Sequence, residues 1–179
     1  MQARKVLLGA EVKAIFCSPL LRARETASIV YDTHPSASFS VCDDLNEIDF
    51  GGAEGLPQPL ALAYLAPTYL AWSEGRYDQH AGLIGESGTR VRQRAVAAAE
   101  TLLGACHFGG QVVGVSHSAV LKVILATLLN VPLSVLRGFG QENCAVNALD
   151  FDMSSGVVEA VVINNQLVRG RAELMARTA

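Results

Sequence analysis

Two short apolar runs in the chain each pass directly into a stretch with helical spacing. The first run, Val12–Cys17, is β-branched and aromatic, and Ser18 after it is a good N-cap, which predicts a strand and then a helix over Pro19–Tyr31. The second run, Gln111–Ser116, has the composition of a buried strand, and a helix is expected directly after it over Ser118–Leu129. Strands that alternate with helices in this way predict an α/β domain.

The rest of the chain continues this alternation. Further helices are expected over residues 60–74, interrupted by Pro67, and over residues 87–103, ended by Gly104. Further strands are expected over residues 38–42, 145–151 and 157–163. We therefore expect a three-layer sandwich with a mostly parallel sheet and helices on both faces.

Length and composition limit what such a domain can do. The 179 residues are 50% hydrophobic and 17% charged, which indicates one folded domain over residues 1–179 rather than a disordered chain. The net charge of −3 argues against a protein that coats nucleic acid or an anionic membrane. No signal-peptide core and no membrane span are recognised, so we expect a cytoplasmic protein.

Neither the cysteines nor the other residues that commonly bind metals have the spacing of a known metal site. Four cysteines are spread over the chain without a close pair, and we expect buried free thiols. No cofactor and no metal site are expected, because nothing matches a known ligand spacing.

Ligands of α/β sheets bind beyond the carboxyl ends of the strands, and two junctions place polar groups there. At the first junction, Arg22 and Arg24 fall in the first turns of a helix, where N–H groups and an arginine together suit an anion. The alternative is a solvated pair of arginines with Glu25 or Glu47 as partner. His117 lies at the second junction. A histidine there could carry protons near neutral pH, or it could have only the structural role of a hydrogen bond to a nearby carbonyl.

Two other patterns around these junctions carry less information. Residues 114–118 approach the G-x-S-x-G nucleophile elbow, but Ser118 replaces the final glycine and no histidine follows His117, which disfavours a serine hydrolase. The loop after residue 45 contains Glu47 and Asp49, and a glutamate beside an arginine-lined anion site can serve as general acid.

Five segments, taken in order, resemble the histidine phosphatase superfamily, branch 1, which contains the phosphoglycerate mutases. They are FCSPLLRARETASIV, LNEIDFGGAEGL, GESGTRVRQR, VVGVSHSAVLKVIL and ENCAVNALDF. The resemblance implies a phosphoglycerate mutase-like fold and a small-molecule phosphate substrate. It also implies that residues of about 53–86 form a cap that sets specificity, and the apolar composition of this segment suggests a less polar substrate.

The resemblance also assigns roles to residues of this sequence. Arg22 matches a phosphate-pocket arginine, Glu47 the general acid, and His117 the histidine that contacts the transferring phosphoryl group. The substrate-binding residues would be Ser18, Ser118 and Asn143.

The sequence departs from the family at its beginning. The family starts with a strand and an Arg-His-Gly motif whose histidine is the nucleophile, and we expect both to be missing from this chain. The strand is central in the family, so its loss would leave backbone groups of two neighbouring strands unpaired. Three alternatives could restore the pairing: the segment 166–173 with Arg169, a partner chain, or closure of the sheet. If a second copy of the chain is the partner, the protein would be a homodimer.

Three function classes follow from these observations. The first is a phosphatase or mutase-like hydrolase whose nucleophile is missing from this chain. The second is a non-hydrolytic protein that binds a phosphorylated or carboxylated small molecule in the same pocket. The third is an enzyme that uses Glu47 and His117 for acid–base chemistry without a phosphohistidine.

Overall fold

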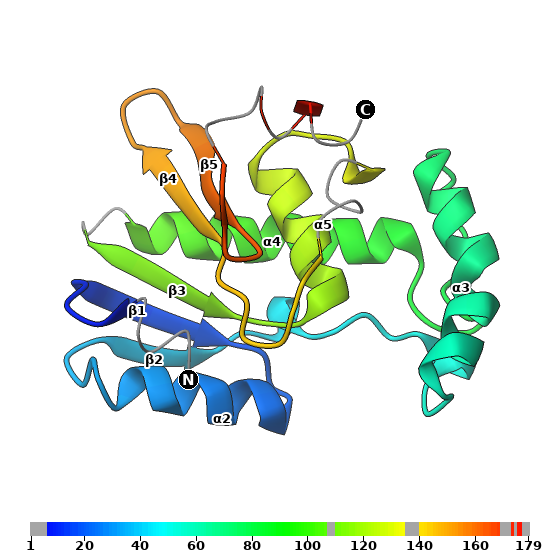
Figure 1. Ribbon diagram of the computed structural model, residues 1–179, viewed down its shortest axis with the longest axis horizontal. Helices are drawn as coiled ribbons and strands as arrows, with labels where there is room; N and C mark the ends of the chain where they lie inside the picture. Colours follow the sequence, from blue (N-terminus) through cyan, green and yellow to red (C-terminus); the bar gives the residue numbers. More distant parts are fainter. Residues whose placement is uncertain (1–6, 107–109, 135–139, 169–172, 174, 177–179) are drawn as a thin grey trace.

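The computed structural model describes residues 7–106, 110–134, 140–168, 173 and 175–176, whose strands form two separate sheets (Figure 1). The parallel sheet has the order β2-β1-β3 and consists of β1 (Val12–Cys17), β2 (Ser38–Val41) and β3 (Gln111–Val115). The antiparallel sheet has the order β4-β5-β6 and consists of β4 (Ala148–Asp152), β5 (Val157–Ile163) and β6 (Gln166–Leu167). The α/β class is confirmed, but the described strands do not form the single, mostly parallel sheet that we expected.

The three parallel strands end at one common edge. Cys17, the last residue of β1, pairs with Val41 on one side and with Val115 on the other. The residues that follow β1 and β3 therefore emerge next to each other, which brings Ser18 and His117 together although 99 positions separate them.

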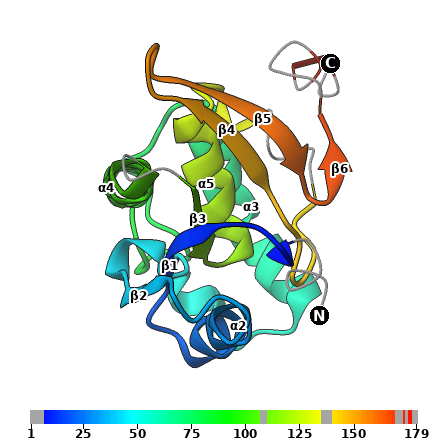
Figure 2. The ribbon, with the colours of Figure 1, turned by 90° about the vertical axis from the view of Figure 1, so that its left-hand side faces the viewer.

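Helices cover both faces of the parallel sheet, and Figure 2 shows α2 on one face and α4 and α5 on the other. Their bounds are α2 (Leu21–Tyr31), α3 (Gln58–Ser73), α4 (Gly88–Cys106) and α5 (Ser118–Leu128). Two short 3₁₀ turns, Asp43–Leu45 and Gly51–Ala53, lie between β2 and α3. In Figure 1, α3 stands at the side of the molecule, away from the antiparallel sheet.

Helix α5 packs against both sheets. Val120 and Ile124 belong to the cluster that also contains Trp72 of α3 and Val91 of α4. Leu125 and Leu129 instead pack with Ile163 of the antiparallel sheet. Because α5 buries residues on most of its circumference, it is the element that joins the two sheets.

Three local expectations differ from the structure at helix boundaries. Helix α2 begins at Leu21 rather than Pro19, because Ser18 is turned inward and does not act as its N-cap. Pro67 lies inside α3, where burial of Leu65 and Ala71 against the core compensates for the lost backbone hydrogen bond. Helix α4 continues past Gly104 to Cys106.

The four cysteines are free thiols, as expected, but only Cys17 is buried. Burial raises the pKa of the Cys17 thiol, which keeps it protonated and unreactive. Cys144 is exposed, because it lies in the loop before β4 rather than in the core.

No helix in the described part of the chain is both long enough and apolar enough to cross a bilayer. One alternative was that residues 166–173 fill the place of the missing central strand, and this is wrong for the first of these residues. Gln166–Leu167 pairs with β5 at the far edge of the antiparallel sheet. Arg169 lies outside the described residues.

Two glycines of α4 provide a matched test of packing. A Cβ on Gly88 would lie 2.8 Å from Nε1 of the buried Trp72, whereas a Cβ on Gly104 would meet nothing within 4 Å. We expect Gly88→Ala to lower the free energy of unfolding by about 1–3 kcal/mol, because the indole is fixed by its hydrogen bond to the Gln79 carbonyl. Gly104→Ala should raise it by about 0.5–1 kcal/mol through helix propensity. Urea unfolding of both variants checks this, and equal effects would contradict it.

Candidate phosphate site

Five of the predicted site residues line one cavity of about 1090 Å³ that extends along β3 and includes the carboxyl edge of the parallel sheet. They come from the start of α2, the loop after β2, the junction of β3 and α5, and the loop before β4. These residues are Arg22, Glu47, His117, Ser118 and Asn143. The sixth, Ser18, is fully buried behind His117 and does not line the cavity. Segments that are distant in sequence thus converge on one place.

The imidazole of His117 is held from behind by Ser18. His117 is 7% exposed, and its Nε2 lies 2.7 Å from the hydroxyl oxygen of Ser18. Burial lowers the pKa of His117; the nearby Glu47 carboxylate opposes this effect, and Arg22 adds to it. His117 is therefore a neutral imidazole at pH 7, fixed in orientation by a hydroxyl group.

The carboxylate of Glu47 lies at the amino end of α5. It accepts hydrogen bonds from the backbone N–H groups of Val120 at 3.1 Å and Ala119 at 3.4 Å. A helix N-terminus carries partial positive charge and free N–H groups, so it holds an anion well. Glu47 fills the inner part of this position, while the N–H of Ser118 has no partner among the residues that the structure describes.

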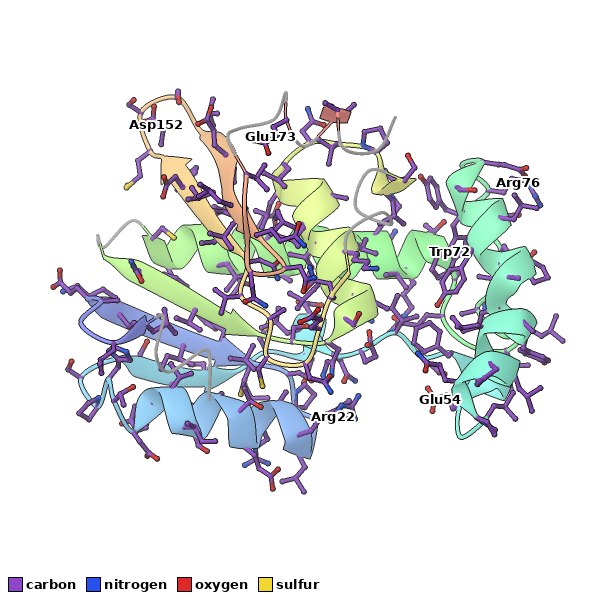
Figure 3. All side chains as sticks on the ribbon, in the orientation of Figure 1. Arg22, Glu54, Trp72, Arg76, Asp152 and Glu173 are labelled. Atoms are coloured by element: carbon purple, nitrogen blue, oxygen red, sulfur yellow. The ribbon has the colours of Figure 1, made fainter. Side chains whose placement is uncertain are left out.

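Arg22 presents an unpaired guanidinium to the same cavity. It lies at the amino end of α2, at the edge where β1 and β3 end (Figure 3). Arg22 is exposed, and its side chain has no ion pair or hydrogen bond with any described residue, so the alternative of a pair with Glu25 or Glu47 is wrong for this part of the chain. Arg24 does not line the cavity. A free guanidinium beside free N–H groups is suited to a phosphate or carboxylate.

A buried ion pair that the sequence did not indicate fixes the loop that carries Glu47. Arg94 of α4 donates to Glu86 at 2.7 Å, and both side chains are only 12% exposed. The same guanidinium donates to three loop carbonyls, those of Asp44 at 3.0 Å, Asn46 at 2.7 Å and Glu47 at 3.2 Å. Burial by itself would raise the pKa of Glu86, but hydrogen bonds from Arg94 and from the Asp49 amide lower it. Arg94 therefore positions Glu47 without lining the cavity.

The loop that carries Glu47 also packs tightly against the loop between α3 and α4. A Cβ on Gly85 would clash with the Asp49 carbonyl, and one on Gly82 would clash with the Phe50 carbonyl. The amide of Glu86 donates to the Asp49 carbonyl at 2.9 Å, which ties the two backbones together. These glycines allow a contact between backbones that no side chain would permit.

Comparison with known proteins identifies the family. A model of the histidine phosphatase superfamily (branch 1) matches residues 1–164. The chain belongs to this superfamily.

Proteins similar to this chain include a phosphatase. The chain is 31% identical over 166 residues to 2-carboxy-D-arabinitol-1-phosphatase of Triticum aestivum, a match that covers 92% of the chain and 32% of the relative. The chain spans about a third of the length of the curated relatives it matches.

Solved structures of the superfamily share the fold. A mycobacterial glucosyl-3-phosphoglycerate phosphatase in complex with inorganic phosphate superposes with a TM-score of 0.74 at 25% identity, covering 92% of this chain and 82% of that chain. An alpha-ribazole phosphatase from Shigella flexneri gives 0.67 at 25% identity, covering 95% and 83%.

The structure also shows how Ser116 of the elbow-like sequence is held. Ser116, which occupies the nucleophile position of the elbow-like sequence, donates its hydroxyl to the Leu45 carbonyl at 2.6 Å. The hydroxyl is thus engaged in holding the loop before Glu47.

The lowered pKa of His117 predicts a pH dependence of stability. The unfolded chain takes up a proton on this side chain near its ordinary pKa of 6.5, whereas the folded chain does so only at lower pH. Above about pH 6.5 this difference does not reduce the free energy of unfolding. As the pH falls below that value, the unfolded chain binds the proton first, so the free energy of unfolding decreases. Urea unfolding at about pH 7.5, 6.5 and 5.5 should show a decline that is smaller in His117→Gln. Equal declines in the two proteins would contradict the assignment.

Proposed function

We propose that the chain provides the phosphate pocket of a phosphoric monoester hydrolase that acts on a small anionic molecule. One observation carries this proposal: the unpaired guanidinium of Arg22, the free N–H of Ser118 and the buried imidazole of His117 line one cavity with the carboxyl group of Glu47. Positive charge and N–H donors that are already in place stabilise the charge that develops on a phosphoryl group.

Each residue has a defined role in this proposal. Arg22 and the N–H of Ser118 bind the phosphoryl oxygens, and His117 contacts the phosphoryl group from the buried side, with Ser18 fixing its orientation. Glu47, once protonated, gives its proton to the leaving oxygen of the alcohol. Asn143, which is exposed on the loop before β4, provides an amide for the rest of the substrate.

The nucleophile in this proposal is a histidine outside residues 1–179. The superfamily uses the histidine of an Arg-His-Gly motif, and this motif does not occur in the sequence. In the first step the imidazole nitrogen attacks phosphorus, the bond to the alcohol oxygen breaks, and that oxygen takes the proton from Glu47. In the second step water attacks the phosphohistidine, Glu47 recovers a proton, and inorganic phosphate leaves.

The segment that we expected to cap the pocket, about residues 53–86, would choose the substrate. It contains α3, whose Leu60, Leu62 and Leu70 are exposed. None of residues 53–86 lines the cavity, so the expectation of a less polar substrate rests on the composition of this segment. A cytoplasmic location and a homodimer stay predictions.

A second candidate function is binding without turnover, which the absence of an Arg-His-Gly motif from the sequence favours. In that case the pocket would hold a phosphorylated or carboxylated small molecule through Arg22 and the N–H of Ser118. Ligand would stabilise the folded chain without being consumed.

Turnover of para-nitrophenyl phosphate tests the two candidates. We expect little turnover by residues 1–179 alone, and turnover with an acid-labile phosphoenzyme when a strand ending in Arg-His-Gly is joined ahead of residue 1. His117→Ala in the joined form should lower kcat by about 100-fold or more. Thermal stabilisation by phosphate, with no turnover in either form, would overturn the hydrolase in favour of the binder.

A further inference from the structure

The turn between β5 and β6 consists of two asparagines. Asn164 has a φ angle of 47° and Asn165 one of 63°, and the strand residues on either side of them pair with each other. A two-residue hairpin turn of this kind needs positive φ at both positions, which glycine adopts without cost and asparagine tolerates. The shape of the turn alone therefore does not explain why both positions carry a side chain.

Both side chains hold the loop that precedes β4. The Oδ1 atom of Asn164 accepts the backbone amide of Glu142 at 2.9 Å. The Oδ1 atom of Asn165 accepts the amide of Val146 at 2.9 Å, and the Asn165 amide donates in return to the Val146 carbonyl at 3.0 Å. Asn164 is only 8% exposed, so its hydrogen bonds are shielded from water. Both ends of the segment 142–146 are thus fixed to one turn.

A pair of side-chain amides closes the base of the same loop. Gln141 and Asn147 exchange two hydrogen bonds of 3.0 Å each. The backbone amide of Asn164 also donates to Oδ1 of Asn147 at 3.0 Å. A Cβ on Gly140 would lie 2.9 Å from Nδ2 of Asn164, so the chain enters the loop in contact with the turn. The loop 141–147 is therefore built against the two asparagines at its beginning and at its end.

The tip of this loop is a strained turn. The Ala145 amide donates to the Glu142 carbonyl at 3.0 Å, which makes Asn143 and Cys144 the two central residues. Cys144 has a φ angle of 60°, which residues other than glycine, asparagine and aspartate seldom adopt. Such a conformation persists only where its surroundings hold it, and it is common beside binding sites. The asparagine turn provides that support.

The tip of the loop lies at the phosphate end of the cavity. Figures 1 and 2 both show the loop before β4 reaching from the antiparallel sheet to the carboxyl ends of β1 and β3. Asn143 lines the cavity together with Arg22 and His117. Its side chain is exposed and has no hydrogen-bond partner in the part of the chain that the structure describes. An amide with free donors and a free acceptor is therefore held next to the phosphate residues.

The charges along the cavity differ between its two sides. Among the described residues that line it, Arg22 is the one arginine or lysine, and it lies at the amino end of α2. Glu142 and Asp150 line the wall formed by the loop and β4. Hydroxyl groups can donate to carboxylates and can both donate to and accept from amides, whereas a second anionic group would meet like charge on this wall.

We propose that Asn164 and Asn165 are positioning residues for substrate recognition, which hold the amide of Asn143 against the alcohol part of a phosphate ester. The class of alcohol carries several hydroxyl groups and no second negative charge, because amides and carboxylates line this wall. The recognition rests on the proposed function, in which the phosphate lies at Arg22. Neither asparagine of the turn lines the cavity, so both act through the loop 141–147.

Glycine in the turn separates its shape from its side chains. Asn164→Gly and Asn165→Gly keep a residue that adopts positive φ but remove the acceptors of the Glu142 and Val146 amides. We expect hydrogen exchange at each of these two amides to become about fivefold faster or more in the corresponding variant. The amides within β5 should keep their protection, because the hairpin itself is retained.

Ser155→Gly is the matched control. It also introduces glycine into a hairpin turn, at the other end of β5, and removes one side-chain hydrogen bond, the one that the Ser155 hydroxyl donates to Asp152 at 2.8 Å. Ser155 does not contact the loop 141–147 and does not line this cavity. Its replacement should leave exchange at Glu142 and Val146 and the affinity for every ligand within about twofold of the original chain.

Three phosphates with six carbon atoms test recognition by the 179-residue chain. They are hexyl phosphate, D-glucitol 6-phosphate and 6-phospho-D-gluconate, with inorganic phosphate as the reference. Calorimetric titration should show that D-glucitol 6-phosphate binds about 3- to 10-fold more tightly than hexyl phosphate, as expected for one added hydrogen bond. It should also bind about threefold or more tightly than 6-phospho-D-gluconate, whose carboxylate meets Glu142.

The variants should change this preference rather than the binding of phosphate itself. In Asn143→Ala and in Asn164→Gly, we expect D-glucitol 6-phosphate and hexyl phosphate to bind within about twofold of each other. Asn164→Gly should lower the affinity for inorganic phosphate much less than the affinity for D-glucitol 6-phosphate. A merely structural role of the turn would instead weaken all four ligands alike.

Each outcome decides one claim. Loss of the preference in Asn143→Ala and Asn164→Gly, with faster exchange at Glu142, supports the proposal. Faster exchange with an unchanged preference overturns it, and so does equal weakening of all four ligands. Tightest binding of 6-phospho-D-gluconate overturns the class of alcohol. If not even inorganic phosphate binds, the proposed function fails and recognition fails with it, while the exchange rates still decide whether the turn holds the loop.

Discussion

Replacing Arg22 with alanine is expected to weaken vanadate or phosphate binding, and turnover in the joined form, by about 100-fold or more. Loss of one group that binds the charge of a transition state has this magnitude. Stability should not change by more than about 0.5 kcal/mol, because the Arg22 side chain is exposed and has no partner among the described residues. Calorimetric titration with vanadate and urea unfolding measure the two effects separately.

Arg24→Ala is the matched control for this experiment. Arg24 lies on the same helix and is also exposed, but it does not line the cavity, so its loss should leave the affinity within about twofold if the effect is local rather than one of net charge. Equal losses in the two variants would mean that the helix attracts anions only through its overall charge. In that case Arg22 is not part of a site.

The largest effect on stability is expected for Arg94→Ala. Removing this guanidinium leaves the Glu86 carboxylate buried without its partner and takes a donor from three loop carbonyls. Breaking one side of a buried ion pair typically lowers the free energy of unfolding by about 3–5 kcal/mol. Urea unfolding measures this change. In the joined form, turnover should also fall, because the loop that carries Glu47 loses its support.

Arg90→Ala is the control for Arg94, because it removes the same charge from the same helix. The Arg90 side chain is 76% exposed, and it reaches Glu86 only at 3.6 Å, so its loss should change stability by less than about 1 kcal/mol. The double change Arg94→Met with Glu86→Leu should recover part of the loss, since it leaves no buried charge. A small effect of Arg94→Ala alone would show that water enters and replaces the guanidinium.

The sequence predicted local structure better than the assembly of the sheets. Strand β5 was placed at its observed bounds, 157–163, and α5 was placed within one residue, because β-branched runs and helical spacing are local signals. The separation into two sheets was not predicted. Gln111–Ser116 has the composition of a buried strand, and nothing local to it indicates that its second edge has no neighbour among the described strands.

The candidate site, like the fold, was predicted from the sequence only in part. Arg22 and His117 were singled out because their residue types at strand ends indicate anion and proton chemistry, and Glu47 mainly through the family resemblance. The fold brings all three to one cavity. Arg94 was not singled out as a site residue. An arginine at helical spacing resembles a solvated surface residue. Besides Glu86, its partners are backbone carbonyls 47–50 positions away, which have no signature in a sequence.

In the proposed function, the glycine contact between the loop of Glu47 and the loop after α3 would link the choice of substrate to acid catalysis. Gly85 lies against the Asp49 backbone with no side chain between them, and the Glu86 amide donates to the Asp49 carbonyl, so a shift of one backbone would displace the other. A change in α3 that admits a bulkier substrate would therefore also shift the proton donor. Evolution of new substrates in this chain would proceed through paired changes, one that reshapes the cap and one that returns Glu47 to its place.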